Sequence, residues 1–151
     1  ITPHNIGLGA KYSSSKLFVD KTNLGASFIK SKLPFKSNNK NYMQPINVEI
    51  KPFDEYLELC GEVGIIKLDV EGMEYEVLKG GFKFINKSKI PILMEYILDK
   101  NTIIKLKKII SMLNKIYSIK GIDKMGKRTI FNPEESYENI LFERKNNKHG
   151  K

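Results

Sequence analysis

Two short apolar runs in the middle of the chain predict the core of a sheet. Residues 64–70 and 90–96 are apolar almost throughout, as in strands that are buried on both faces. A segment long enough for a helix separates the two runs, as a right-handed crossover between parallel strands requires. We therefore predict that residues 65–69 and 92–95 form adjacent parallel strands in the centre of the sheet.

The flanking patterns predict further strands and helices. Apolar side chains in residues 102–117 recur at spacings of three and four, which indicates a helix with one buried face. The glycine pair at 80 and 81 is typical of a helix end with a left-handed residue. The other predicted elements are strands at 1–8, 16–20, 46–50, 117–122 and 139–143, short helices at 52–59 and up to residue 78, a polar turn at 11–15, and a long irregular loop at 21–44.

The order of these elements predicts an α/β fold, a mostly parallel sheet with helices on its faces. We expect residues 1–143 to be a portion of a single domain and residues 144–151 to be a polar, flexible tail. Ligands of such sheets bind at the carboxyl ends of the strands. Two acids, Asp69 and Glu95, stand at or near such ends.

Composition narrows the classes of function. No apolar run approaches the roughly 20 residues that span a bilayer. The one cysteine excludes an internal disulfide and favours a reducing compartment, so we expect a cytoplasmic protein. The net charge of +9 comes almost entirely from lysine, whereas nucleic-acid recognition favours the planar fork of arginine. The abundance of Lys, Asn and Ile is better explained by an AT-rich coding sequence than by a nucleic-acid surface.

The most specific pattern lies between residues 65 and 81. An apolar strand leads into Asp69-Val70-Glu71-Gly72, followed by an acidic helix start and by Val77-Leu78-Lys79-Gly80. This stretch resembles the signature of FkbM-type methyltransferases. Three more segments resemble the parts of that family that surround the signature. Residues 91–95 resemble the next strand, residues 48–59 the preceding strand and short helix, and residues 5–19 an Asn-x-Ala-Leu hairpin.

The resemblance implies a partial Rossmann-like class I methyltransferase fold. It also implies S-adenosylmethionine as methyl donor and a hydroxyl oxygen of a sugar or small metabolite as acceptor. Asp69 would be catalytic, as proton acceptor or orienting group, while Glu71 and Glu95 would bind substrate hydroxyls. Asn5 and Gly7 would lie beside the adenine of the cofactor in a complete family member.

Each acid also has a structural explanation. From its position alone, Asp69 could instead cap the following helix, and Glu71 could serve only the helix dipole. Glu95 could be a solvated charge at a strand end.

The chain departs from the family pattern because no segment supplies the Gly-x-Gly loop or the ribose-binding acid. Gly7-Leu8-Gly9 lacks a third glycine and a following helix. We interpret the chain as the C-terminal part of a domain, a fragment or truncated gene product without the N-terminal cofactor-loop unit. Alone, it should bind S-adenosylmethionine weakly or not at all.

The alternative function is that of a non-catalytic remnant acting as a binding or interaction module. The expected partner is a hydroxyl acceptor on a small molecule or glycan, with neither a membrane nor nucleic acid as partner. His4 and His149 are far apart in the sequence and have no cysteine pair between them, so we expect no metal site.

Overall fold

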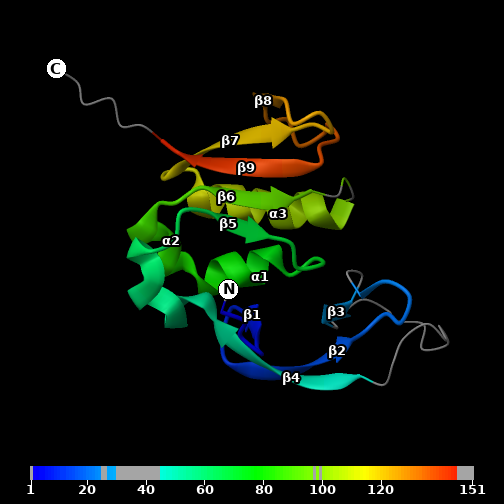
Figure 1. The fold of residues 1–151 in the computed structure, drawn as a ribbon. Helices are drawn as coiled ribbons and strands as arrows, with labels where there is room; N and C mark the ends of the chain where they lie inside the picture. The colour runs from blue at the N-terminus through cyan, green and yellow to red at the C-terminus, as the bar shows by residue number, and fades with distance from the viewer. Residues whose placement is uncertain (1, 25–26, 30–44, 97, 99, 146–151) are drawn as a thin grey trace. The chain divides into compact units, whose positions relative to one another are not determined.

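The computed structural model describes residues 2–24, 27–29, 45–96, 98 and 100–145. The chain forms two compact units (Figure 1). The first consists of Ile1–Glu55 with Val70–Gly81, and the second of Tyr56–Asp69 with Phe82–Lys151. The 3-10 helix η2 (Phe53–Gly61) crosses from the first unit to the second, and the non-helical backbone of Tyr56 interrupts it at the crossing.

The first unit contains a mixed four-stranded sheet. Its strands lie in the order β1 (Gly7–Gly9), β4 (Ile46–Pro52), β2 (Ser13–Phe18) and β3 (Phe28–Ile29). β4 is parallel to β1 and antiparallel to β2. The helix α1 (Glu74–Gly80) contacts β1 and β4.

Two expectations for this sheet are wrong. Ser13, Ser14 and Ser15 do not form a turn, because they pair with β4 as the first half of β2. β1 and β2 do not form a hairpin either, since β4 lies between them. Ser13 and Ser14 are exposed, and a strand that pairs through its backbone can carry polar side chains toward water. Their polar character therefore concealed a strand.

The expected long loop at 21–44 contains a short strand. β3 pairs with β2, and the rings of Phe18 and Phe28 stack with their centroids 5.6 Å apart. Asp20 begins a tight turn just before this strand. Its Oδ1 accepts hydrogen bonds from the backbone N–H of Thr22 and of Asn23. Residues 25–26 and 30–44 of the expected loop lie outside the described residues.

The glycine pair at the end of α1 is required because no side chain fits there, and not because the backbone is left-handed. Gly81 has a φ of −108° and its N–H donates to the carbonyl of Val77, so the predicted left-handed residue is wrong. A Cβ built on Gly80 would overlap the carbonyl oxygen of Gly9 in β1. A Cβ built on Gly81 would lie 2.6 Å from Cδ1 of Phe53. Both positions therefore exclude a side chain.

The second unit contains a five-stranded sheet. Its strands lie in the order β5 (Ile66–Leu68), β6 (Ile92–Glu95), β9 (Asn139–Arg144), β7 (Tyr117–Ile122) and β8 (Arg128–Ile130). β5 and β6 are adjacent and parallel, as predicted, with Ile66 paired with Ile92. β9 is antiparallel to both of its neighbours, and β8 is antiparallel to β7.

Three predictions for this sheet are therefore wrong. The sheet is mixed rather than mostly parallel, and β5 lies at its edge rather than in its centre. Ile140, Leu141 and Phe142 are consecutive and all buried, because β9 holds the middle position. β8 was not predicted, and Arg144 belongs to β9 rather than to the expected tail. Residues 146–151 of that tail lie outside the described residues.

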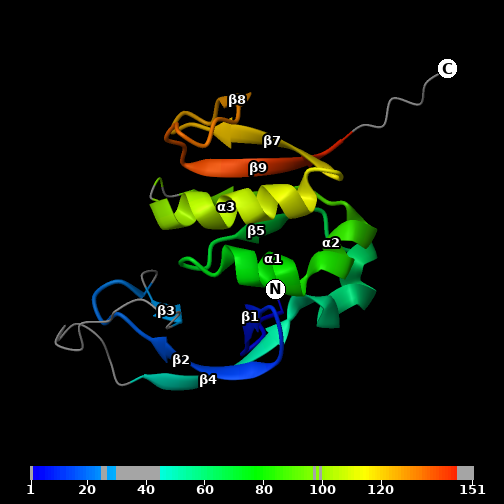
Figure 2. The same ribbon diagram turned by 180° about the vertical axis from the view of Figure 1, so that it is seen from behind.

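Two helices complete the second unit. α2 (Phe82–Ser88) buries Phe84 and Ile85, while α3 (Lys100–Leu113) lies along one face of the five-stranded sheet (Figure 2). α3 ends four residues before the predicted boundary, because Tyr117 already belongs to β7. The hydroxyl of Tyr117 donates to the carbonyl of Ile90 at 2.8 Å, and burial raises the pKa of Tyr117 to about 12.

Candidate functional site

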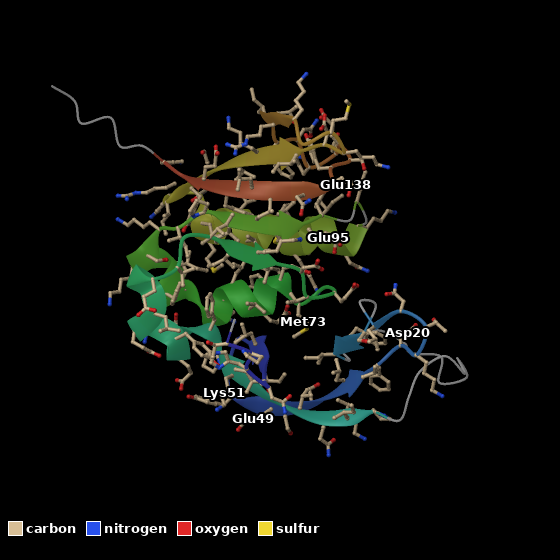
Figure 3. The ribbon with its side chains drawn as sticks, in the orientation of Figure 1. Asp20, Glu49, Lys51, Met73, Glu95 and Glu138 are labelled. Carbon is tan, nitrogen blue, oxygen red and sulfur yellow. The ribbon has the colours of Figure 1, made fainter. Side chains whose placement is uncertain are left out.

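Two of the predicted site residues lie on neighbouring strands, at the end of the five-stranded sheet where β5 and β6 finish. Leu68 is paired with Met94, so Asp69 and Glu95 occupy the next positions along two parallel strands. Figure 3 shows Glu95 at this end of the sheet in the second unit. The structure thus confirms that both acids lie at the carboxyl ends of neighbouring strands, where ligands of α/β sheets bind.

A lysine and an amide lie beside the acids. Lys67 Nζ is 3.5 Å from Asp69 Oδ2 and 3.3 Å from Asn139 Oδ1. Asn139 is paired with Glu95 across β6 and β9. Sequence reasoning missed both residues. Lys67 could have been found, because residues two apart in a strand share a face, whereas Asn139 needed the order of the strands.

The contact between Lys67 and Asp69 leaves both groups in water. Their side chains are 49% and 52% exposed, and an ion pair in that setting adds little to stability. The arrangement can orient Asp69 without burying it. A carboxylate with this exposure can accept a hydrogen bond from a ligand hydroxyl.

The helix that follows Asp69 is not capped by a side chain. The N-cap position of α1 is Met73, where no side-chain cap hydrogen bond forms. The interpretation of Asp69 as a helix cap is therefore wrong. The acid nearest to the start of α1 is Glu74, whose Oε1 accepts a hydrogen bond from the N–H of Gly72 at 3.0 Å.

The first unit holds Glu71 in an unusual backbone conformation. Glu71 has a φ of 47° and Gly72 a φ of 88°, so two successive residues are left-handed. Glycine adopts this region readily, whereas a glutamate pays a free-energy cost there. Residues with such backbone strain cluster at functional sites. The substrate-binding role of Glu71 stays a prediction, and so does its role toward the helix dipole.

Asn5 and Gly7 lie in the first unit. Asn5 is exposed and precedes β1. A Cβ on Gly7 would overlap Cδ1 of Ile50 and lie 3.1 Å from Cδ1 of Ile29. Isoleucine side chains thus fill the space beside Gly7, so a residue with a side chain does not fit at this position. The cofactor-binding role of Asn5 and Gly7 stays a prediction.

Two other features are absent from the described part of the chain. It contains no group of three or more His, Cys, Asp or Glu side chains placed to hold a metal ion. None of the helices described there is long and apolar enough to cross a membrane.

Comparisons with known proteins connect this geometry with a family. The family model of the methyltransferase FkbM domain matches residues 1–115. Among solved structures, the chain is similar to the methyltransferase FkbM from Methylobacillus flagellatus KT, with a TM-score of 0.52 and 19% identity. This likeness covers 94% of the present chain but only 28% of that protein. A search of curated proteins found no match. Because the family model covers most of its length, the chain belongs to the FkbM methyltransferase family.

Proposed function

We propose that a complete form of this domain transfers a methyl group from S-adenosylmethionine to a hydroxyl oxygen of a sugar or small metabolite. Membership of the FkbM family supports methyl transfer. The observation that carries the acceptor side of the proposal is the placement of Asp69 and Glu95 at one sheet edge. Carboxylates suit a hydroxyl substrate because they accept its hydrogen bonds.

Asp69 is the proposed proton acceptor. Methylation of an alcohol oxygen requires loss of its proton, and a carboxylate within hydrogen-bonding reach can take it. Asp69 directly follows β5, so a rigid strand positions it while half of its side chain stays exposed. Lys67 orients the carboxylate, and Glu95 contacts a second hydroxyl of the acceptor. Glu71 is proposed as a further substrate contact.

The cofactor requires residues beyond those described here. The sequence has no Gly-x-Gly loop followed by a helix. In addition, β5 has a strand partner on only one side among the described residues. An apolar parallel strand is usually covered on both sides, so the open side of β5 could pair with an added strand from a cofactor-binding unit.

Two measurements test the proposal. In calorimetry, the 151-residue chain should show no micromolar binding of S-adenosylmethionine, which would correspond to roughly −8 kcal/mol. Binding of that strength would show that the cofactor site lies within these residues. A longer form with a glycine-rich unit should transfer labelled methyl groups to a hydroxyl acceptor. A longer form that binds the cofactor but methylates nothing in a broad panel of alcohols and sugars would favour the non-catalytic alternative.

A further inference from the structure

The β7–β8 hairpin carries two exposed apolar side chains, Met125 in its turn and Ile130 at the end of β8. Met125 is 93% exposed and Ile130 is 84% exposed, more than any other large hydrophobic side chain among the described residues. Single exposed apolar residues are common and need no explanation. Here the two most exposed ones belong to the same hairpin, at the outer edge of the five-stranded sheet (Figure 1).

Three hydrogen bonds to Asp123 define the turn of this hairpin. Asp123 Oδ1 accepts hydrogen bonds from the N–H groups of Met125 and Lys127, each at 2.9 Å. The carbonyl of Asp123 accepts a third from Gly126, whose φ of 76° suits glycine. The exposure of Met125 therefore follows from a fixed turn that holds it away from the sheet.

Three lysines lie on the same hairpin. Lys124 and Lys127 flank Met125 in the turn and are exposed, and Lys120 is paired with Ile130 across the two strands. Within the described part of the chain, no ion pair joins these three lysines to an acid. Arg128, by contrast, is paired with Glu143. The turn thus combines one exposed apolar side chain with two exposed lysines, which outnumber its single acid, Asp123.

We propose that this hairpin docks on the surface of an anionic lipid membrane. Met125 would enter the boundary between headgroups and acyl chains, while the lysines would lie against the lipid phosphates. Apolar side chains and lysines together bind anionic bilayers in this way. A nucleic acid would match the lysines but not Met125, because its phosphates are contacted by polar groups.

Surface docking needs no membrane-spanning segment. The expectation of no membrane partner rested on the absence of such a segment, and β8 was not among the predicted strands. The hairpin turn also lies at the same end of the sheet as Asp69 and Glu95. Ile122, the last residue before the turn, is paired with Asn139, and Asn139 is paired with Glu95. The turn therefore begins at the end of the sheet where the two acids lie. The docking proposal does not depend on the proposed methyl transfer.

Fluorescence gives the direct test, because the chain contains no tryptophan. Met125→Trp places a single reporter at the tip. Its emission should shift to shorter wavelength with vesicles of phosphatidylcholine and phosphatidylglycerol, but not with phosphatidylcholine alone. Leu24→Trp is the matched control, since Leu24 is 73% exposed in the first unit, and its emission should not shift. An equal shift in both variants, or none in Met125→Trp, would overturn the proposal.

Vesicle cosedimentation tests the two components separately. Met125→Ser should weaken binding about tenfold. Lys124→Glu with Lys127→Glu should weaken it by more than about 25-fold, since each lysine near an anionic surface contributes about a factor of five. The control with the same change in net charge is Lys11→Glu with Lys16→Glu, which should have a clearly smaller effect.

Three results would contradict docking by this hairpin. The first is an equal loss in both charge-reversal pairs, and the second is unchanged binding by Met125→Ser. The third is binding to duplex DNA that depends on Lys124 and Lys127, combined with no binding to anionic vesicles. That last result would assign the lysines to a nucleic-acid surface instead.

Discussion

The family signature joins two regions that are held in different ways. At its beginning, Asp69 and Glu71 are exposed carboxylates, and the backbone at Glu71 is left-handed. At its end, Gly80 and Gly81 are buried, and neither has room for a single added carbon atom. The beginning carries reactive groups with little structural support, whereas the end consists of backbone packed against backbone and an aromatic ring.

This difference separates the residues of the signature that can serve activity from those that the packing of the fold requires. A residue whose side chain makes few contacts can be replaced without unfolding the protein, so its effect on activity can be measured separately from its effect on stability. A glycine that lies against another strand is required by packing alone. Mutations at the two ends should therefore separate activity from stability.

The largest expected effect is that of Asp69→Asn on turnover in a longer, active form. Asn keeps the size of the side chain and an oxygen that can accept from Lys67, but it removes the charge and the basicity. If Asp69 takes the acceptor proton, turnover should fall by about 10²–10⁴, with an unchanged melting temperature. Kinetics with the hydroxyl acceptor as substrate would measure turnover, and thermal unfolding would measure the melting temperature.

Lys67→Met is the control for this substitution. It removes the contact with Asp69 but keeps the carboxylate, so turnover should fall less than in Asp69→Asn. Wild-type turnover in Asp69→Asn would remove Asp69 from the mechanism, while membership of the family would stand. A parallel loss of stability would instead place Asp69 with the structural residues at the other end of the signature.

The second effect is on stability and concerns the packed end. Gly80→Ala should destabilise the chain by about 3 kcal/mol or more, because the added carbon would overlap the carbonyl of Gly9, which belongs to a paired strand. Gly64→Ala is the matched control, since no atom lies within 4 Å of a Cβ at that position. Urea unfolding of both variants would measure the difference. Equal stabilities would show that α1 can move away from β1 at low cost.

The sequence patterns predicted which segments form strands and helices better than they predicted which strands lie next to each other. The apolar runs located β5 and β6 and their parallel pairing, because burial and connection length are local properties. The edge position of β5 depends on which strands pair elsewhere, and no local pattern records that order. For the same reason Asp69 and Glu95 were predicted at one edge, whereas Asn139 was not. The packing of Gly80 against Gly9 was equally hidden, since it depends on the approach of two backbones distant in sequence.

The third prediction returns to the exposed end. Glu71→Gly should stabilise the chain slightly, by about 1 kcal/mol or less, because glycine adopts a positive φ without the steric cost that glutamate pays. Lys89→Gly is the control, because Lys89 has a φ of 52° and lies outside the signature. Both variants should resist denaturant equally or better than the parent, but only Glu71→Gly should raise the KM for the acceptor in a longer form. An unchanged KM would leave Glu71 without a substrate role.

The last prediction concerns a hydrogen bond between the left-handed turn of the signature and the first residue of α1. Glu74 Oε1 accepts from the N–H of Gly72, so the first residue of α1 holds the left-handed turn that precedes it. Glu74→Ala should cost more than Glu74→Gln, because it removes the hydrogen bond, worth about 0.5–1.5 kcal/mol net, together with the charge near the helix start. Glu74→Gln keeps an acceptor oxygen and loses only the favourable charge near the helix start, so it should cost about 0.3–1 kcal/mol. Urea unfolding would rank the two. If Glu74→Gln were as damaging as Glu74→Ala, the charge at the helix start rather than the bond to Gly72 would stabilise this turn.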